Sequence, residues 1–378
     1  MSSVNIMEAE RVLTICAACM YCDGLCPVFP ALSDKHDYPT ADLNYLANLC
    51  HNCRSCWYAC QYAPPHPFAV NVPTALAGVR QQSYADHVWP RFLRHAFRYP
   101  ALGAGIVVVV AVLTMLIVVS TKGSFAALCD VRAGPGSFYA VAPWWLMVGL
   151  ASASIGWAVL SLTVSTFRFW RATWAEVQPG ALWLALGPAL SDILTLRHLD
   201  GGGPGCNDSG IRFSRSRRGL HQLMAAGVVL DFAATLAAAV YQDVLGASPP
   251  FAYTSFPVGA GFIGGVAVAI GAAGLLTIEA RADREPSERG EVHLNLVFLV
   301  ALELTVLSGL AVLVWRDTTA MGPLLAFHLS VVIGLFAALP ASKALHAPFR
   351  AAALLRLALD RQRLRGADEA PNEVTISE

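Results

Sequence analysis

Eight cysteines in the first sixty residues fall into two runs of identical spacing. Each run reads C-x2-C-x2-C-x3-C, a spacing whose thiolates hold cubic [4Fe–4S] clusters. Such clusters accept and release single electrons, so the sequence predicts an electron carrier with two clusters. The first run is Cys16, Cys19, Cys22 and Cys26, and the second is Cys50, Cys53, Cys56 and Cys60.

The fourth cysteine of each run is expected to serve the opposite cluster, as in two-cluster ferredoxins. Structural zinc is the main alternative, but its ligands usually come as two pairs separated by a longer loop. Pro27 follows Cys26, as that spacing requires, whereas Gln61 follows Cys60. Thiolate-bound clusters persist in a reducing compartment, which places this part of the chain in the cytoplasm. The prediction is Cys16, Cys19, Cys22 and Cys60 for one cluster, and Cys50, Cys53, Cys56 and Cys26 for the other.

The rest of the chain is too apolar for a soluble protein of this length. Of its 378 residues, 56% are hydrophobic and only 14% are charged, and the apolar residues gather after Pro100. The net charge is zero, which gives no reason to expect a nucleic-acid partner. We predict a ferredoxin-like domain with its linker over residues 1–100, a membrane domain over 101–350 and a cytoplasmic tail over 351–378.

Six apolar segments are each near the roughly 20 residues that cross a lipid bilayer. The sequence therefore predicts an α-helical membrane protein: a ferredoxin-like domain followed by a six-helix transmembrane bundle. Between the second and third segments, residues 168–220 are too polar and glycine-rich to cross, although 181–194 could form an interfacial helix. The predicted spans are 101–120, 140–167, 221–245, 258–278, 294–315 and 324–345.

Lysine and arginine residues predict the orientation of these spans. They concentrate in the segments on the same side as the cysteines, whereas the three opposite loops hold only Lys122, Arg132 and Arg316. Positive residues favour the cytoplasmic side. Both termini are therefore expected in the cytoplasm.

An electron carrier joined to a membrane domain needs a route into the lipid, and haem b bound by two histidines is one such route. His221 and His346 both fall at cytoplasmic ends of spans and form the favoured pair, with His198 in the adjoining loop. Arg217 and Arg218 could pair with haem propionates. Alternatively, His221 is an interfacial residue at the start of a helix.

His328 lies on the same predicted helical face as His346, about 27 Å further along the axis. One helix could thus serve two stacked haems, but no second histidine lies in the outer half of the membrane, so one haem is favoured. Asp231 lies within the third span, where carboxylates are costly and usually functional. His328 and Asp231 could form a proton-transferring pair near a quinone, or an internal pair that only fixes helix packing.

Several motifs resemble the tricarballylate utilization protein B family. The likeness covers nearly the whole chain and is strongest around the cysteine runs. Its motifs are residues 10–16 (ERVLTIC), 42–53 (DLNYLANLCHNC), 60–66 (CQYAPPH), 196–203 (LRHLDGGG) and 232–235 (FAAT), with the surroundings of His328 and His346.

This resemblance implies a protein of the bacterial inner membrane that reoxidises the flavin of a separate FAD-dependent, tricarballylate dehydrogenase-like partner. It implies two [4Fe–4S] clusters and haem b, with electrons passing to membrane quinone. The membrane part also resembles the gamma subunits of respiratory nitrate reductases, in which two helices supply four haem ligands. Here Asp231 and Gln242 stand on the third span where a further histidine could serve, which again favours one haem.

Three alternatives stay open at this point. The same relay could serve another flavoprotein, such as a cobalamin-pathway enzyme, or the chain could be a redox sensor without turnover. A transporter is less favoured, because no inverted repeat is seen in the membrane part. No nucleophile or acid–base pair stands out in the sequence, so chemistry on an organic substrate is expected on the partner.

Overall fold

The structure is a computed structural model that describes all residues except 1, 34–36, 175–180, 202 and 369–378. The described residues form helices joined by loops, with one isolated β-bridge between Cys206 and Ser214. The chain divides into two compact units. Unit 1 comprises residues 1–83, 166–214 and 346–378, and unit 2 comprises 84–165 and 215–345.

Unit 1 holds both cysteine runs within a helical core. Helix α1 buries Ala9, Val12 and Leu13, the spacing of one helical face, and Leu43, Leu46 and Leu49 of α3 pack in the same core. The helices of this unit are α1 (Ser2–Cys19), α2 (Pro30–Ser33), α3 (Thr40–Leu49), α4 (Ser55–Tyr58), most of α5 (Val72–His87), α9 (Ala181–Thr195) and α14 (His346–Asp368). Helix α8 (Trp144–Thr173) begins in unit 2 and ends in unit 1.

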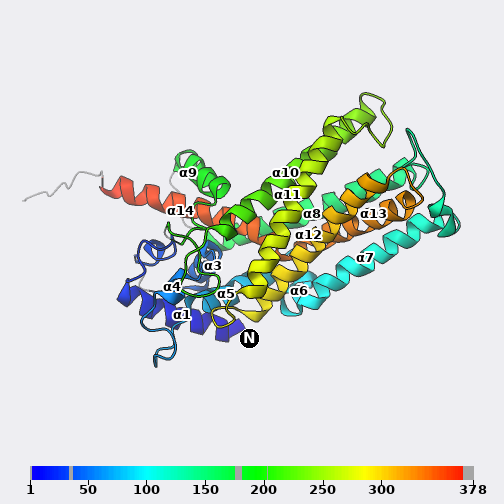
Figure 1. Ribbon diagram of the computed structural model, residues 1–378. Helices are drawn as coiled ribbons and strands as arrows, with labels where there is room; N and C mark the ends of the chain where they lie inside the picture. Colours follow the sequence, from blue (N-terminus) through cyan, green and yellow to red (C-terminus); the bar gives the residue numbers. More distant parts are fainter. Residues whose placement is uncertain (1, 34–36, 175–180, 202, 369–378) are drawn as a thin grey trace, which may run out of the picture. The chain divides into compact units, whose positions relative to one another are not determined.

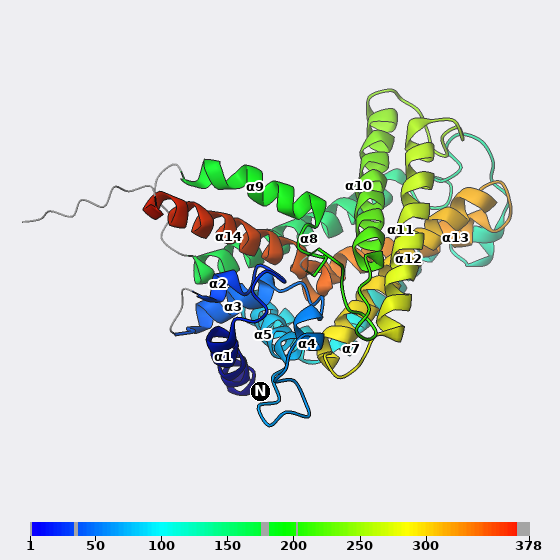
Figure 2. The same ribbon diagram turned by 60° about the vertical axis from the view of Figure 1, so that its left-hand side comes forward.

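The segment predicted as a tail supplies helix α14 to unit 1. Ala353, Leu354 and Leu357 join the core that contains α1 and α3, and Ala358 packs with Ala189 of α9. Helices α9 and α14 lie side by side (Figure 2). Residues from the middle and the end of the chain thereby complete the domain that carries the cysteines.

Arg356 of α14 anchors this helix to α3. Its Nη2 lies 2.6 Å from Asp42 Oδ1, its guanidinium lies 4.1 Å from the centre of the Tyr45 ring, and its Nη1 donates to the carbonyl of Thr173. The residue is buried, with 8% of its surface exposed. Arg356 is therefore the polar centre of the contact between α3 and α14.

We expect Arg356→Ala to lower the free energy of unfolding of unit 1 by about 3 kcal/mol, because it removes the buried guanidinium from the partly buried Asp42 carboxylate. Thermal unfolding followed by the visible absorbance of the cluster-loaded protein measures the change. Arg361→Ala is the matched control: Arg361 is 44% exposed on the same helix and should contribute less than about 1 kcal/mol. Equal effects of the two substitutions would contradict the anchoring role.

Six long apolar helices lie in unit 2, except for the end of α8, and they confirm the predicted helical membrane fold. They are α7 (Pro100–Ser120), α8, α10 (Ser216–Asp243), α11 (Phe256–Arg281), α12 (Arg289–Trp315) and α13 (Met321–Ala338), the last extended to Ala341 by the short helix η3 (Leu339–Ala341). The other short helices are η1 (Arg91–Leu93), α6 (Arg94–Arg98), η2 (Ala126–Cys129) and η4 (Lys343–Leu345).

The span boundaries differ from the predicted ones by a few residues. The third helix begins at Ser216, not His221, because charged side chains such as Arg217 tolerate a helix end at the lipid boundary. The sixth ends at Ala341, after Pro340 has closed the regular helix. Val108, Val112 and Leu116 of α7 are exposed, which suits contact with lipid.

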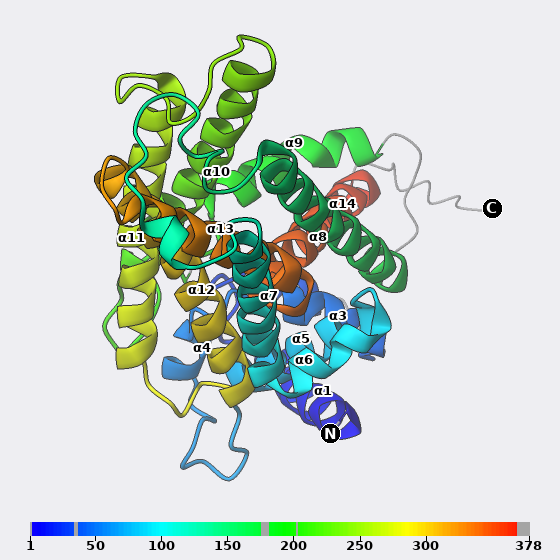
Figure 3. The same ribbon diagram turned by 90° about the vertical axis from the view of Figure 1, so that its right-hand side faces the viewer.

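Within unit 2, α7 packs on α13, and α11 and α13 each pack on α12 (Figures 1 and 3). Helix α10 pairs with α11 through small residues. A Cβ atom added to Gly227 would lie 2.7 Å from the carbonyl oxygen of Gly264, which shows how closely the two backbones approach.

Candidate iron–sulfur sites and membrane histidines

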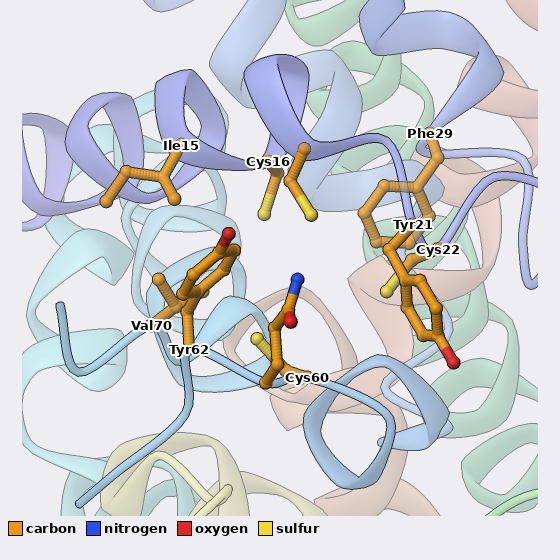
Figure 4. A pocket seen from close by; sticks show the side chains of 10 residues that line it. Ile15, Cys16, Tyr21, Cys22, Phe29, Cys60, Tyr62 and Val70 are labelled. Carbon is orange, nitrogen blue, oxygen red and sulfur yellow. The ribbon is translucent and has the colours of Figure 1, made fainter. Parts of the chain in front are cut away.

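The first candidate site is a pocket lined by thiols from both cysteine runs. Cys16 and Cys19 lie in the last turn of α1, where a positive φ of 48° at Met20 turns the chain toward Cys22. The fourth thiol, Cys60, comes from the second run (Figure 4). The space enclosed is about 340 Å³, open solvent included, and its remaining wall consists of Ile15, Tyr21, Phe29, Gln61, Tyr62 and Val70.

The second candidate site has the reciprocal composition. Cys50 directly follows α3, and the loop after it turns through positive φ values at Asn52 and Arg54 before α4 begins. The pocket encloses about 350 Å³, open solvent included. Its thiols are Cys26, Cys50, Cys53 and Cys56, the last three of them buried.

Burial and neighbouring thiols raise the pKa of cysteines in both pockets. Burial raises the pKa of Cys16 to about 12, with further contributions from Cys22, Cys60 and Cys19. Burial also raises the pKa of Cys56 well above its usual value, followed by the effect of Cys53, Cys26 and Cys50 and, from the first pocket, Cys22. Cys16 and Cys56 are therefore protonated at neutral pH in the cofactor-free chain. Iron ions would supply the positive charge that lets them ionise.

The arrangement of the thiols suits a cluster. Among the residues that the structure describes, no three His, Cys, Asp or Glu side chains lie close enough to share one metal ion. The cysteines are instead distributed around the walls of the two pockets. A [4Fe–4S] cube takes one thiolate at each of four iron corners, so two sets of four thiols match its donor requirement.

Residues 199–201 and 203–210 close over the loop that carries Cys53. The Asn207 amide donates to the Cys53 carbonyl (2.9 Å), and the Gly210 amide donates to the Tyr58 hydroxyl (3.0 Å). Leu199 and Cys206 are buried against Cys53. We call these residues the cover. In the sequence they fall within the polar connection between the second and third spans, and the glycine run 201–205 is the signal that could indicate a close contact there.

Comparisons with known proteins match the cysteine-bearing part and the apolar helices to two separate family descriptions. Residues 9–86 match the family described as "Citrate utilization protein B Fer4-like domain", and residues 99–368 match "Citrate utilization protein B". The curated Citrate utilization protein B of Escherichia coli is 38% identical over 359 residues, which cover 94% of this chain and 93% of that protein. The chain belongs to the Citrate utilization protein B family. No solved structure matches it.

The Fer4-like match spans both cysteine runs and supports the predicted iron–sulfur role in electron transfer. The family name refers to citrate utilization, whereas the predicted resemblance was to tricarballylate utilization. Tricarballylate, the partner dehydrogenase, the haem and the quinone are therefore taken up under the proposed function.

His198, a predicted candidate for haem ligation, lies in unit 1 beside the second cysteine pocket. Its Nε2 lies 2.8 Å from Asp192 Oδ2, and its ring meets that of His51 edge-on at 5.9 Å between centroids. His51 lines the second pocket. Burial lowers the pKa of both histidines, and Arg350 lowers that of His51 further. A carboxylate thus already engages Nε2 of His198 in the structure, and haem ligation by this residue stays a prediction.

His328 has a different partner from the one predicted. Its Nδ1 lies 3.0 Å from the hydroxyl oxygen of Ser308 on α12, and its ring packs against Gly309, where an added Cβ would lie 2.9 Å from Cε1. Asp231 lies against α11 instead, with its Oδ1 2.3 Å from the position of a Cβ on Gly264. The predicted pairing of His328 with Asp231 is therefore corrected: each residue is packed against a different neighbouring helix.

His221 and His346 belong to different units, so their pairing stays a prediction. His221 lies in the second turn of α10, and Arg217 and Arg218 lie in its first turn. An imidazole with two guanidinium groups one turn away has the chemistry that a haem and its propionates require.

Proposed function

We propose that this protein carries electrons from the reduced flavin of a cytoplasmic dehydrogenase to membrane quinone. The observation that carries the proposal is the joining of two four-thiol pockets, in a Fer4-like domain, to six apolar helices in one chain. Cys16, Cys19, Cys22 and Cys60 hold one [4Fe–4S] cluster, and Cys26, Cys50, Cys53 and Cys56 hold the other. Each cluster supplies one-electron transfer.

The first pocket is where the partner flavoprotein delivers electrons. Its four cysteines are only partly buried, and Tyr21 on its wall is 70% exposed. The second pocket has three fully buried cysteines and lies against the cover. A protein partner can therefore bring its flavin closer to the first site.

His221 of α10 and His346 at the start of α14 bind haem b in this proposal, with Arg217 and Arg218 holding its propionates. Asp231 delivers a proton to the quinone. The support for this role is the cost of placing a carboxylate in an apolar helix.

The partner oxidises a tricarboxylic acid. The relative's name refers to citrate, and the sequence motifs resemble a family associated with tricarballylate. A tricarballylate dehydrogenase-like flavoprotein agrees with both the relative's name and the motifs, because its substrate is a tricarboxylic acid. A flavoprotein of the cobalamin pathway is the second candidate, since its module shares the same motifs.

The deciding experiment uses the full chain in quinone-containing liposomes with a tricarballylate dehydrogenase-like flavoprotein and its substrate, without oxygen. We expect continuous flavin reoxidation with one quinol formed per substrate oxidised. Without quinone, flavin oxidation should stop once the metal centres are filled. Centres that become reduced but never pass electrons to quinone would reject this function in favour of a redox sensor.

The same assay tests Asp231. Asp231→Asn should slow quinol formation while reduction of the clusters and the haem spectrum stay unchanged. Wild-type turnover in this variant would leave Asp231 with a packing role only.

A further inference from the structure

The two pockets differ in charge. The described residues that line the first pocket with its cysteines include no arginine, lysine or histidine. The second pocket is lined by His51 and Arg54. A charge in a pocket wall acts directly on the charge of whatever occupies the pocket, so this difference distinguishes the two clusters electrostatically.

Arg54 is held rigidly at the second pocket. Only 2% of its surface is exposed, and its backbone has a left-handed φ of 64°. Its Nη1 donates to the Asp208 carbonyl of the cover at 3.0 Å. A guanidinium stays charged under all conditions found in proteins, so Arg54 adds a fixed positive charge to the residues that line the second pocket.

Two further arginines act at the end of helix α3, which leads directly into Cys50. Arg350 Nη2 donates to the Cys50 carbonyl at 2.5 Å, and its Nε lies 3.4 Å from the Asn48 carbonyl. Arg80 Nε donates to the Ala47 carbonyl at 2.8 Å. The C-terminal carbonyls of a helix carry partial negative charge, which would repel an added electron. These arginines offset that charge beside the second pocket.

We propose that Arg54 and Arg350 raise the reduction potential of the second cluster above that of the first, and so direct electrons from the first site to the second. The proposal rests on the two-cluster function proposed above. In the transfer, the first cluster loses one electron and the second gains it, with no bond or proton exchanged. The added electron makes the second cluster more negative, and a nearby fixed cation favours that form.

Burial acts in the opposite direction. A low-dielectric surrounding disfavours the more highly charged reduced cluster, and the second pocket is the more buried one. Without the arginines, the second cluster would be the poorer electron acceptor. A unit charge at the pocket wall changes such an equilibrium by about tenfold or more at an effective dielectric constant near 20, so Arg54 acts against this effect of burial.

The test is a redox titration of the purified full chain, followed by paramagnetic resonance of each reduced cluster. Cys16→Ser and Cys56→Ser assign the signals, since each perturbs the cluster that it binds. In the unsubstituted protein, the second cluster should be reduced first. Arg54→Gln should shift its reduction equilibrium at least tenfold toward the oxidised form, which is 59 mV for one electron, and leave the first within about threefold.

Three variants complete the test. Arg54→Lys keeps the charge and should stay within about threefold of the unsubstituted protein. Arg350→Gln removes a charge from a different helix and should shift the second cluster in the same direction, which keeps the test decisive if Arg54→Gln loses that cluster. Arg11→Gln is the matched control, because Arg11 is an exposed arginine of unit 1 bonded to Glu8.

An unshifted second cluster in Arg54→Gln and Arg350→Gln would overturn the proposal, as would a first cluster with the higher potential. Neither result would touch the proposed function, because iron, sulfide and quinone turnover are measured separately. Absence of two clusters would reject the function itself.

Discussion

Cys60→Ala is expected to remove the first cluster and spare the second, although Cys60 ends the second cysteine run. In the structure, Cys60 lines the pocket that contains Cys16, Cys19 and Cys22. Cys26→Ala should have the reciprocal effect, because Cys26 lies with Cys50, Cys53 and Cys56. Each variant should retain about four of the roughly eight iron atoms of two cubane clusters.

Iron and sulfide analysis with paramagnetic resonance measures both effects. Cys129→Ala is the control, since Cys129 is exposed at the end of the short helix η2 in unit 2 and this substitution should leave the iron content unchanged. If Cys60→Ala removed the second cluster and Cys26→Ala the first, each run would bind its own cluster. That result would contradict the assignment of Cys60 and Cys26 to the cluster of the opposite run.

The long apolar helices were readily predicted from the sequence. Their signal is local: twenty or so apolar residues in succession, which α7 displays without interruption. The spacing of the cysteines is local in the same sense. Both predictions depend on residues close together in the chain, and the six helices and the Fer4-like match support them.

The composition of unit 1 could not be predicted in this way. Asn207 bonds to Cys53 across 154 residues, and Arg350 bonds to Cys50 across 300. No periodic pattern of residues in the sequence predicts contacts over such separations. The sequence predicts a polar, glycine-rich connection over 168–220 and a cytoplasmic tail over 351–378, and only the contacts of the cover and α14 place parts of them in the domain that carries the cysteines.

Individual polar residues were equally hard to place. Arg54 looks like an exposed loop residue between two cysteines, and only its burial shows that its charge bears on a pocket. Ser308 is unremarkable within the apolar sequence of α12, so His328 was given the more conspicuous Asp231 as its partner. Residue type and depth in the membrane do not determine which faces of two helices meet.

Gly201 in the cover is the glycine whose replacement should affect the second cluster most. A Cβ at this position would lie 2.1 Å from the Gly205 carbonyl oxygen and 2.4 Å from the Ser55 hydroxyl oxygen. Neither backbone can retreat freely, because the Gly205 amide bonds to the Asp200 carbonyl and Ser55 begins α4 beside Cys56. The cover would have to lift from the cysteine loop.

We therefore expect Gly201→Ala to destabilise the closed cover by about 1–3 kcal/mol, the usual cost of overpacking. Since about 1.4 kcal/mol is a tenfold change in an equilibrium, the second cluster should be lost to air or chelator roughly 5 to 140 times faster, while the first decays at its usual rate. Decay of the two paramagnetic resonance signals measures the rate at which each cluster is lost.

Gly203→Ala is the control: Gly203 has a φ of 116° in the same loop but no atom within 4 Å of an added Cβ. Alanine at this position strains the backbone without a steric clash, so the variant separates the effect of backbone strain from that of the clash. Equal loss of the second cluster in both variants would show that loop conformation, and not closure over Ser55, protects that cluster.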